Sequence, residues 1–214
     1  MPIGDASRTQ ADDQKPILVE QDGFLLAEAE EFSEQSMTEK RAFYVTSAMQ
    51  TPDVTPDGDD PHWKNASGKS YLEVLPDTRR THADKLLKAE NFSDLPGKLA
   101  VLKYQVQITN PGRYYVWVRA YSTGSEDNGI HVGLDGTWPP SGQRMQWCDG
   151  KKSWRWESKQ RTEQQHCGEP YKIYLDIEKS GAHTIEFSMR EDGFEFDQWL
   201  LTTDREFIPE ERRK

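Results

Sequence analysis

Hydrophobic and polar residues alternate through most of the chain, in short segments that are separated by turn sequences. Residues 99–109 and 114–121 place apolar side chains at every second position, and Asn-Pro-Gly-Arg at 110–113 lies between them. A period of two residues predicts a β-strand with one buried face, and the Asn-Pro-Gly-Arg sequence predicts a turn between two such strands. Further strand-like segments are residues 17–20, 24–30, 42–49, 69–75, 130–134, 171–178, 183–189 and 194–202.

This pattern predicts about ten short strands with a turn signal roughly every ten residues. Helical periodicity is nearly absent, and we expect at most one short helix near residues 83–89. Such a pattern is typical of an all-β antiparallel β-sandwich or jelly roll and not of a βαβ fold. We assign the sandwich to residues 17–204.

The two ends of the chain lack this alternation. Residues 1–16 show no apolar periodicity and are predicted to be a flexible linker or a disordered N-terminus. Residues 205–214 are a charged C-terminal tail, in which Phe207 and Ile208 are the apolar residues that can dock on the sandwich.

Charge is distributed unevenly along the sequence. Residues 1–60 carry fourteen acidic and four basic side chains, whereas residues 61–214 carry twenty-three of each. A balanced domain with an acidic N-terminal quarter does not attract nucleic acid over long distances, and no apolar run is long enough to span a bilayer. We therefore expect neither nucleic acid nor membrane as a partner, and we expect a monomer.

Two cysteines, Cys148 and Cys167, bear on the compartment in which the protein works. A disulfide between them would close a loop of about twenty residues and contribute about 3 kcal/mol in the chain-entropy model. The alternative is two free buried thiols. Met-Pro-Ile-Gly at the start is not a signal peptide, which leaves a cytosolic chain or a piece of a larger secreted protein. The disulfide prediction favours the secreted protein.

Tryptophan is concentrated in one loop-rich segment. Trp138, Trp147, Trp154 and Trp156, four of the seven tryptophans, lie within nineteen residues. Exposed indole is normally avoided unless it binds a ligand, and its flat face suits the apolar face of a sugar ring. The alternative is that these side chains fill a satellite core beneath a long loop.

Basic residues accompany these tryptophans. Residues 142–161 contain two acidic residues, Asp149 and Glu157, and six basic ones: Arg144, Lys151, Lys152, Arg155, Lys159 and Arg161. Guanidinium groups beside stacking rings suit a polysaccharide that bears sulfate or carboxylate. Single-stranded nucleic acid would also suit them, but no RNA-binding signature is present. A solvated basic face is the remaining alternative.

Residues 51–60 are rich in proline and aspartate and contain an Asp-x-Asp pattern. Such a pattern can indicate calcium, but the glycine and the ligand spacing of a calcium-binding helix-loop-helix are absent. We predict a solvated loop.

Four motifs occur in the order found in a known group of domains. Residues 26–30 (Leu-Ala-Glu-Ala-Glu), 111–120 (a turn and a tyrosine-rich strand), 130–136 (a strand that ends in Asp-Gly) and 194–199 (Phe-Glu-Phe-Asp-Gln-Trp) resemble carbohydrate-binding modules of families 6 and 35. The resemblance covers roughly residues 20–203 and implies their galactose-binding-like β-sandwich.

The resemblance also implies a structural calcium ion. In those modules the first and last strands lie side by side, and the matching residues here are Glu28, Glu30 and Asp197. Three converging carboxylates repel one another, and a hard cation that prefers six to eight oxygens relieves this repulsion. The alternative is that Glu28 and Glu30 face solvent on an edge strand.

For the sugar, the resemblance points to Trp154 as the stacking side chain, with Trp138 or Trp147 beside it and Trp156 in the core. An insertion of about thirty residues after the Asp-Gly turn departs from the family pattern, so the geometry of the family's sugar site cannot be copied directly onto this chain. Loop placement and charge add further candidate ligand-binding residues: Arg79, Glu126, Asp127, Asn128 and Arg155.

Catalytic signatures are not found in the sequence. The sequence contains no carboxylate pair with a glycosidase-like flanking motif and no histidine or cysteine spacing typical of a zinc site. It also contains no glycine-rich phosphate-binding loop and no nucleophile-elbow serine. We therefore expect a non-catalytic module that binds a polysaccharide for a catalytic domain attached to it, with anionic and algal polysaccharides among the candidate targets. The alternatives are a jelly-roll polysaccharide lyase or hydrolase, and a structural or adhesion β-sandwich that binds no sugar.

Overall fold

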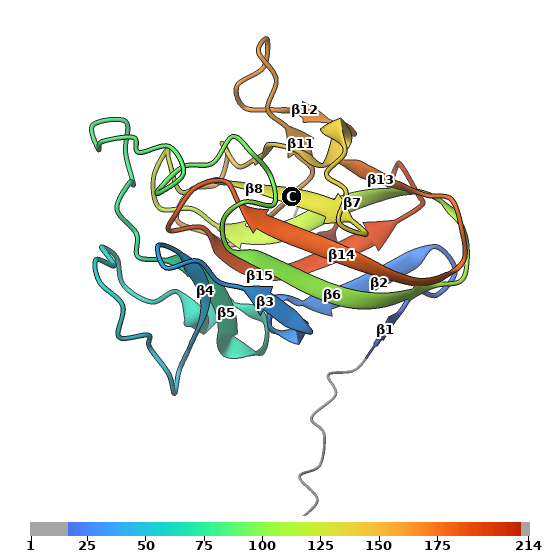
Figure 1. Cartoon of the computed structure of the whole chain (residues 1–214), viewed down its shortest axis with the longest axis horizontal. Helices are drawn as coiled ribbons and strands as arrows, with labels where there is room; N and C mark the ends of the chain where they lie inside the picture. Colours follow the sequence, from blue (N-terminus) through green and yellow to red (C-terminus); the bar gives the residue numbers. More distant parts are fainter. Residues whose placement is uncertain (1–16, 211–214) are drawn as a thin grey trace, which may run out of the picture.

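Residues 17–210, the part of the chain that the computed structural model describes, form two β-sheets that pack face to face (Figure 1). One sheet has eight strands in the order β1-β6-β14-β8-β9-β11-β12, with β3 beside β6. These strands are β1 (Leu18–Val19), β3 (Glu34–Ser36), β6 (Val101–Ile108), β8 (Gly129–Leu134), β9 (Met145–Gln146), β11 (Lys159–Gln160), β12 (Glu169–Pro170) and β14 (Gly181–Met189).

The second sheet has seven strands in the order β10-β7-β15-β5-β4, with β13 beside β7 and β2 beside β15. These strands are β2 (Phe24–Glu28), β4 (Ala42–Ser47), β5 (Ser70–Leu75), β7 (Gly112–Tyr121), β10 (Arg155–Glu157), β13 (Tyr174–Ile177) and β15 (Glu195–Thr202). Four 3-10 turns complete the described structure: η1 (Ala29–Glu31), η2 (Trp63–Asn65), η3 (Ser67–Lys69) and η4 (Pro140–Gly142). Apart from β1 on β6, the paired strands are antiparallel, which confirms the predicted sandwich.

The main core lies between the two sheets and follows the period of two. In β6, Leu102, Tyr104, Val106 and Ile108 are fully buried, while the intervening Gln105 is exposed. Trp199 of β15 is at the centre, 4.9 Å from the ring of Tyr104 between centroids. Because each strand contributes alternate side chains, the alternation read from the sequence identifies the residues of this core.

The short helix that the sequence allowed near residues 83–89 does not form. No α-helix occurs within residues 17–210, and residues 83–89 are irregular, with turn residues at either end and a single β-bridge from Lys88 to Phe92. The carboxylate of Asp84 accepts the backbone N–H of Thr81 at 2.8 Å, and the Asn91 side chain bonds the backbone of Leu87 and Lys85. Side chains that satisfy nearby backbone groups in this way compete with a helix. The strand predicted over residues 24–30 also ends earlier than expected, at Glu28, and η1 begins at Ala29.

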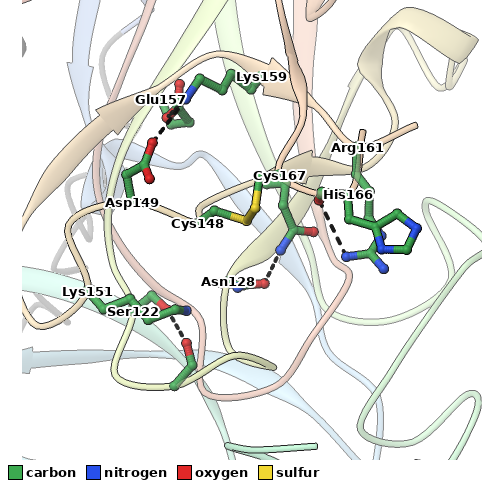
Figure 2. Close-up of a disulfide and its surroundings, with 12 residues drawn as sticks. Ser122, Asn128, Cys148, Asp149, Lys151, Glu157, Lys159, Arg161, His166 and Cys167 are labelled. Carbon is green, nitrogen blue, oxygen red and sulfur yellow. Dashed lines mark hydrogen bonds and ion pairs between the residues drawn. A yellow bond between two sulfur atoms is a disulfide. The ribbon is translucent and has the colours of Figure 1, made fainter. Parts of the chain in front are cut away.

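The tryptophan-rich insertion adds strands to both sheets. β9 and β11 extend the eight-stranded sheet, whereas β10 lies between them in sequence and pairs with β7 of the other sheet. The disulfide between Cys148 and Cys167 closes this insertion and confirms the predicted bridge, with 5.3 Å between the two Cα atoms (Figure 2). Lys159 lies between Asp149 and Glu157, at 3.3 Å from each carboxylate.

Both chain ends extend past the described residues. The predicted linker 1–16 lies outside them, as do residues 211–214. In the described part of the tail, Phe207 packs edge-to-face on Phe24 with 5.5 Å between ring centroids, so this residue docks as expected. None of the helical turns in residues 17–210 has the length and apolar character that a membrane crossing needs.

His131 of β8 gives the fold a pH dependence. Its ring is fully buried, Nε2 lies 3.2 Å from the Ser93 carbonyl, and Nδ1 accepts the backbone N–H of Arg144 at 3.1 Å. Burial, together with the positive charges of the nearby Arg190 and Arg144, lowers the pKa of His131 from 6.5 to about 4. Between pH 6.5 and about pH 4, His131 therefore binds a proton in the unfolded protein but not in the folded protein.

We expect this contribution to be complete above pH 6.5 and to be lost as the pH falls towards 4. Between about pH 7 and about pH 4.5, wild type should lose about 2.5 kcal/mol more unfolding free energy than His131→Gln. Urea unfolding of both proteins at the two pH values measures the difference. Equal losses would show that His131 does not set this dependence.

Candidate functional site

Four loops meet at one end of the sandwich, at the left of Figure 1. The loop between β4 and β5 contacts the loop that follows β5. The guanidinium of Arg80, in the second loop, donates to the carbonyl of Gly58 in the first. Gly124, after β7, lies so close to the backbone of Arg80 that a Cβ there would be 1.9 Å from the Arg80 carbonyl oxygen. The loop before β10 joins through the Lys152 N–H, which donates to the Ser122 carbonyl at 2.8 Å.

Aromatic side chains from three of these segments form a cluster. His62 stacks on Tyr121, the last residue of β7, with 3.8 Å between centroids and 19° between planes. Trp154 packs edge-to-face on Tyr121 at 5.4 Å and on Tyr71 of β5 at 5.3 Å. The Trp154 indole N–H donates to the His62 carbonyl at 3.1 Å, which fixes the loop to the cluster.

Two neighbouring hollows border this cluster and share His62, Tyr121 and Lys152 in their walls. The aromatic hollow, of ≈ 400 Å³, is also lined by Pro61, Lys64, Asn65, Arg119, Ser153 and Trp154. The acidic hollow, of ≈ 540 Å³, is also lined by Asp57, Gly58, Asp59, Asp60, Arg80 and Thr123. A sugar in the aromatic hollow would meet ring edges and faces below and donors from Lys64, Asn65 and Lys152 at the rim.

The structure separates the three predicted stacking tryptophans. Trp154 lines the aromatic hollow but is only 7% exposed, so its faces belong mainly to a satellite core with Tyr71 and Ala66. Trp147 is 2% exposed and packs on Phe194 in the main core, so it offers no face to a ligand. Trp138 is half-buried and lies flat against the backbone of Gly97 and Gly133, away from both hollows.

The predicted polar ligand residues are mostly internal, which corrects the expectation from loop placement. Glu126 is 7% exposed, forms an ion pair with Arg79 and contacts Nδ1 of His82. Asp127 is 1% exposed and accepts the Ser122 hydroxyl at 2.7 Å and the Thr123 N–H at 2.8 Å. These carboxylates order the loop after β7 because buried acceptors need partners, and they leave few atoms for a sugar.

Two further predicted residues complete this comparison. Asn128 is 3% exposed, its N–H donates to Glu191 at 2.9 Å, and its side-chain oxygen accepts from Gln146. Arg155 is exposed, and its Nε donates to the Ser153 hydroxyl at 3.2 Å. Of the predicted ligand residues outside the tryptophans, Arg155 therefore has the most accessible side chain.

Two of the predicted calcium residues, Glu28 and Asp197, lie near each other where β2 pairs with β15, and Glu30 follows in η1. Glu28 Oε1 accepts the Ser67 hydroxyl and the Gln198 amide, each at 2.8 Å, and Asp197 accepts the Ser67 N–H at 2.9 Å. Burial raises the pKa of Asp197 to about 7, although the Arg119 guanidinium on its other oxygen opposes this. Burial also raises the pKa of Glu30.

These residues fit a calcium ion only in part. Glu28 Oε2 is buried without a hydrogen-bond partner, as a vacant ligand atom would be. Arg119, however, already brings a positive charge to Asp197. Residues 17–210 contain two groups of three residues whose potential metal-ligand atoms lie within 4.8 Å of one another inside each group. Neither group contains Glu28, Glu30 or Asp197. The calcium ion at this place stays a prediction.

Sequence reasoning missed the residues that surround the aromatic hollow. In the sequence, His62 stands in a loop without zinc spacing around it, and Tyr121 is only the last residue of a predicted strand. The signal that could have found them is position: both lie where an element ends at the same edge of the sandwich. Their stacking depends on contacts between residues about sixty positions apart, which no local pattern reports.

Comparison with known proteins identifies relatives of the whole domain. A sequence profile described as the glycosyl hydrolase family 115 C-terminal domain matches residues 17–208. A curated relative from Formosa agariphila, called uncharacterized protein P23, is 58% identical over 196 residues, which are 92% of this chain and 48% of that protein. The chain therefore spans about half the length of the curated relative it matches.

Two solved structures illustrate the structural similarity. A GH26-CBM35 β-(1,4)-mannanase from Podospora anserina is 12% identical, with a TM-score of 0.46, over 88% of this chain and 29% of that one. A CBM35 from Paenibacillus barcinonensis is 14% identical, with a TM-score of 0.44, over 84% of this chain and 98% of that one. Modules of family 35, which the sequence motifs resemble, are thus among the structures similar to this chain.

Proposed function

Because this chain belongs to the glycosyl hydrolase family 115 C-terminal domain family, we propose that it is a non-catalytic carbohydrate-binding accessory domain. Its partner would be a catalytic domain in the same secreted protein, and its target a polysaccharide. The relative of twice the length supports an attached domain. The observation that carries the sugar-binding role is the aromatic hollow at the loop end of the sandwich.

In this proposal a pyranose ring packs against Tyr121 and the small part of Trp154 that lines the aromatic hollow. These two rings meet edge-to-face, so they present an angled apolar wall to the ligand. The side chains of Lys64 and Lys152, both exposed, stand at the rim and favour a sugar that bears carboxylate or sulfate. Such contacts select the ligand through ring shape and charge.

An enzyme is the second candidate, because the acidic hollow next to this wall holds Asp57, Asp59 and Asp60 together with His62. Carboxylates and a histidine are groups that lyases and hydrolases use. Incubating the chain with each polysaccharide and measuring reducing ends or unsaturated products separates the two functions. Product release would favour the enzyme over the binding module.

The binding test is affinity electrophoresis on a panel of neutral and anionic polysaccharides. We expect wild type to be retarded on one class, and Tyr121→Ala to bind roughly thirty-fold more weakly or worse, as for a side chain that dominates an interface. Circular dichroism should show that the variant is folded.

The matched control is Leu26→Ala, because Leu26 is 49% exposed and lines a different hollow on the outer face of the seven-stranded sheet. Its affinity should equal that of wild type. Loss of binding in Leu26→Ala with retention in Tyr121→Ala would move the sugar site to that sheet face. Retardation on no polysaccharide would favour the structural or adhesion role.

A further inference from the structure

Two buried glutamates lie directly opposite each other where β5 meets β15. Glu73 and Glu195 are paired residues in this antiparallel ladder, and they are 3% and 1% exposed. Like charges at opposed positions of a sheet repel each other, and burial strengthens the repulsion. Such a pair needs a proton or a cation to balance it.

The loop between β4 and β5 adds two more carboxylates to the same place. Ligand atoms of Asp57, Asp59 and Glu73 all lie within 4.8 Å of one another. Ligand atoms of Asp59, His62 and Glu195 meet the same limit, so Asp59 belongs to both groups. The four acids and the histidine therefore form one cluster.

Two oxygens of this cluster have no hydrogen-bond partner although they are buried: Glu195 Oε2 and Asp57 Oδ1. A buried polar atom without a partner costs about 1–3 kcal/mol, and more when it carries charge. The other oxygen of Glu195, Oε1, lies 2.7 Å from Nδ1 of His62. The unpartnered oxygens lie in the cluster where a bound ion would need ligands.

Protein cations near the cluster offset its charge only in part: the Arg80 guanidinium opposes the rise in the pKa of Asp57 but does not cancel it. Burial lowers the pKa of His62, which favours the neutral ring. Arg80 donates to the Gly58 carbonyl and lies 3.7 Å from Asp77, which is itself buried. Burial, together with repulsion from neighbouring acids, raises the pKa of Glu73, Glu195 and Asp57.

We propose that Asp57, Asp59, Glu73 and Glu195, with His62 at the edge, bind one hard divalent cation such as Ca²⁺ or Mn²⁺. Carboxylate oxygens are the ligands that such cations prefer, and an imidazole is compatible with Mn²⁺. The ion would link a loop to β5 and β15, because two ligands come from residues 51–60 and two from the strands. The solvated loop expected from the sequence becomes a metal-binding loop.

This site is separate from the calcium predicted at Glu28, Glu30 and Asp197, with which it shares no ligand. It is also independent of sugar binding, since the cluster needs only groups of the protein. The ion would nevertheless hold His62 in place, and His62 stacks on Tyr121 in the wall of the aromatic hollow.

The test uses the whole chain, stripped of metal with a chelator and titrated with Ca²⁺, Mn²⁺ or Zn²⁺ by calorimetry. Melting temperature is recorded in parallel. At a cation concentration of about one hundred times Kd, wild type should melt roughly 5–10 °C higher than in chelator. Asp59→Asn and Glu73→Gln should each bind roughly 100-fold more weakly, because each removes a charged ligand.

In chelator the same two variants should melt at or above the wild-type temperature, because they relieve repulsion among the acids. Asp53→Asn, in the same loop but exposed and outside both groups, is the matched control and should bind as wild type does. Glu28→Gln removes the other predicted site, and its titration must retain the binding that Asp59→Asn loses.

Absence of heat and of a melting shift with all three ions would overturn the proposal. So would undiminished binding in both Asp59→Asn and Glu73→Gln. Sugar binding is measured separately, once with the cation and once in chelator, so a failure of this site is distinguishable from a failure of the proposed function.

Discussion

Replacing Trp154 with alanine is expected to lower the free energy of unfolding by about 3–5 kcal/mol. The side chain is 7% exposed, packs on Tyr71 and Tyr121, and donates its N–H to the His62 carbonyl at 3.1 Å. Alanine would leave a cavity and an unpaired carbonyl in the satellite core. Urea unfolding, followed by circular dichroism, measures the loss.

Trp138→Ala is the control, because this ring is only half-buried and lies on the opposite sheet against Gly97 and Gly133. Trp138→Ala should lower the free energy of unfolding clearly less than Trp154→Ala does. An unchanged unfolding midpoint in Trp154→Ala would contradict the packing described here. The comparison also matters for function: Trp154 supports Tyr121 and His62, so weaker sugar binding in Trp154→Ala would not by itself identify a direct contact.

Replacing Arg119 with methionine is expected to cost about 3–5 kcal/mol, measured in chelator by urea unfolding. Arg119 of β7 pairs with Asp197, a fully buried residue of β15, and its guanidinium carbon lies 5.6 Å from the Trp154 ring centroid. Removing the guanidinium leaves the buried carboxylate without its cationic partner. Large costs of this kind follow when one member of a buried ion pair is lost.

Arg113→Met on the same strand provides the control. Arg113 and Asp176 form an exposed pair at 2.8 Å, so this substitution should cost less than about 1 kcal/mol. Similar losses for Arg113→Met and Arg119→Met would refute the importance of burial at Arg119.

The Arg119→Met variant also tests the predicted calcium ion. This test is made in a chain that also carries Asp59→Asn, which weakens the other proposed cation site. If Glu28, Glu30 and Asp197 bind Ca²⁺, added Ca²⁺ should restore part of the stability that Arg119→Met loses there, because the ion takes over the role of the guanidinium. Equal stability of that double variant with Ca²⁺ and with chelator would count against calcium at this site.

The sequence by itself determined the sandwich. Alternation in residues 99–109 and 114–121 corresponds to β6 and β7, and the turn between them is retained. The disulfide between Cys148 and Cys167 was also predictable, because two lone cysteines at this separation can close a loop. These features depend on local periodicity and on covalent chemistry, both of which are visible in the order of residues.

Tertiary structure decided which side chains face a ligand. Trp147 and Trp154 belong to the same tryptophan-rich segment, yet one entered the main core and the other a satellite core. The opposed pair of Glu73 and Glu195 depends on the register of two strands that are far apart in sequence. Burial and pairing of this kind result from long-range packing, and the composition of one segment does not encode them.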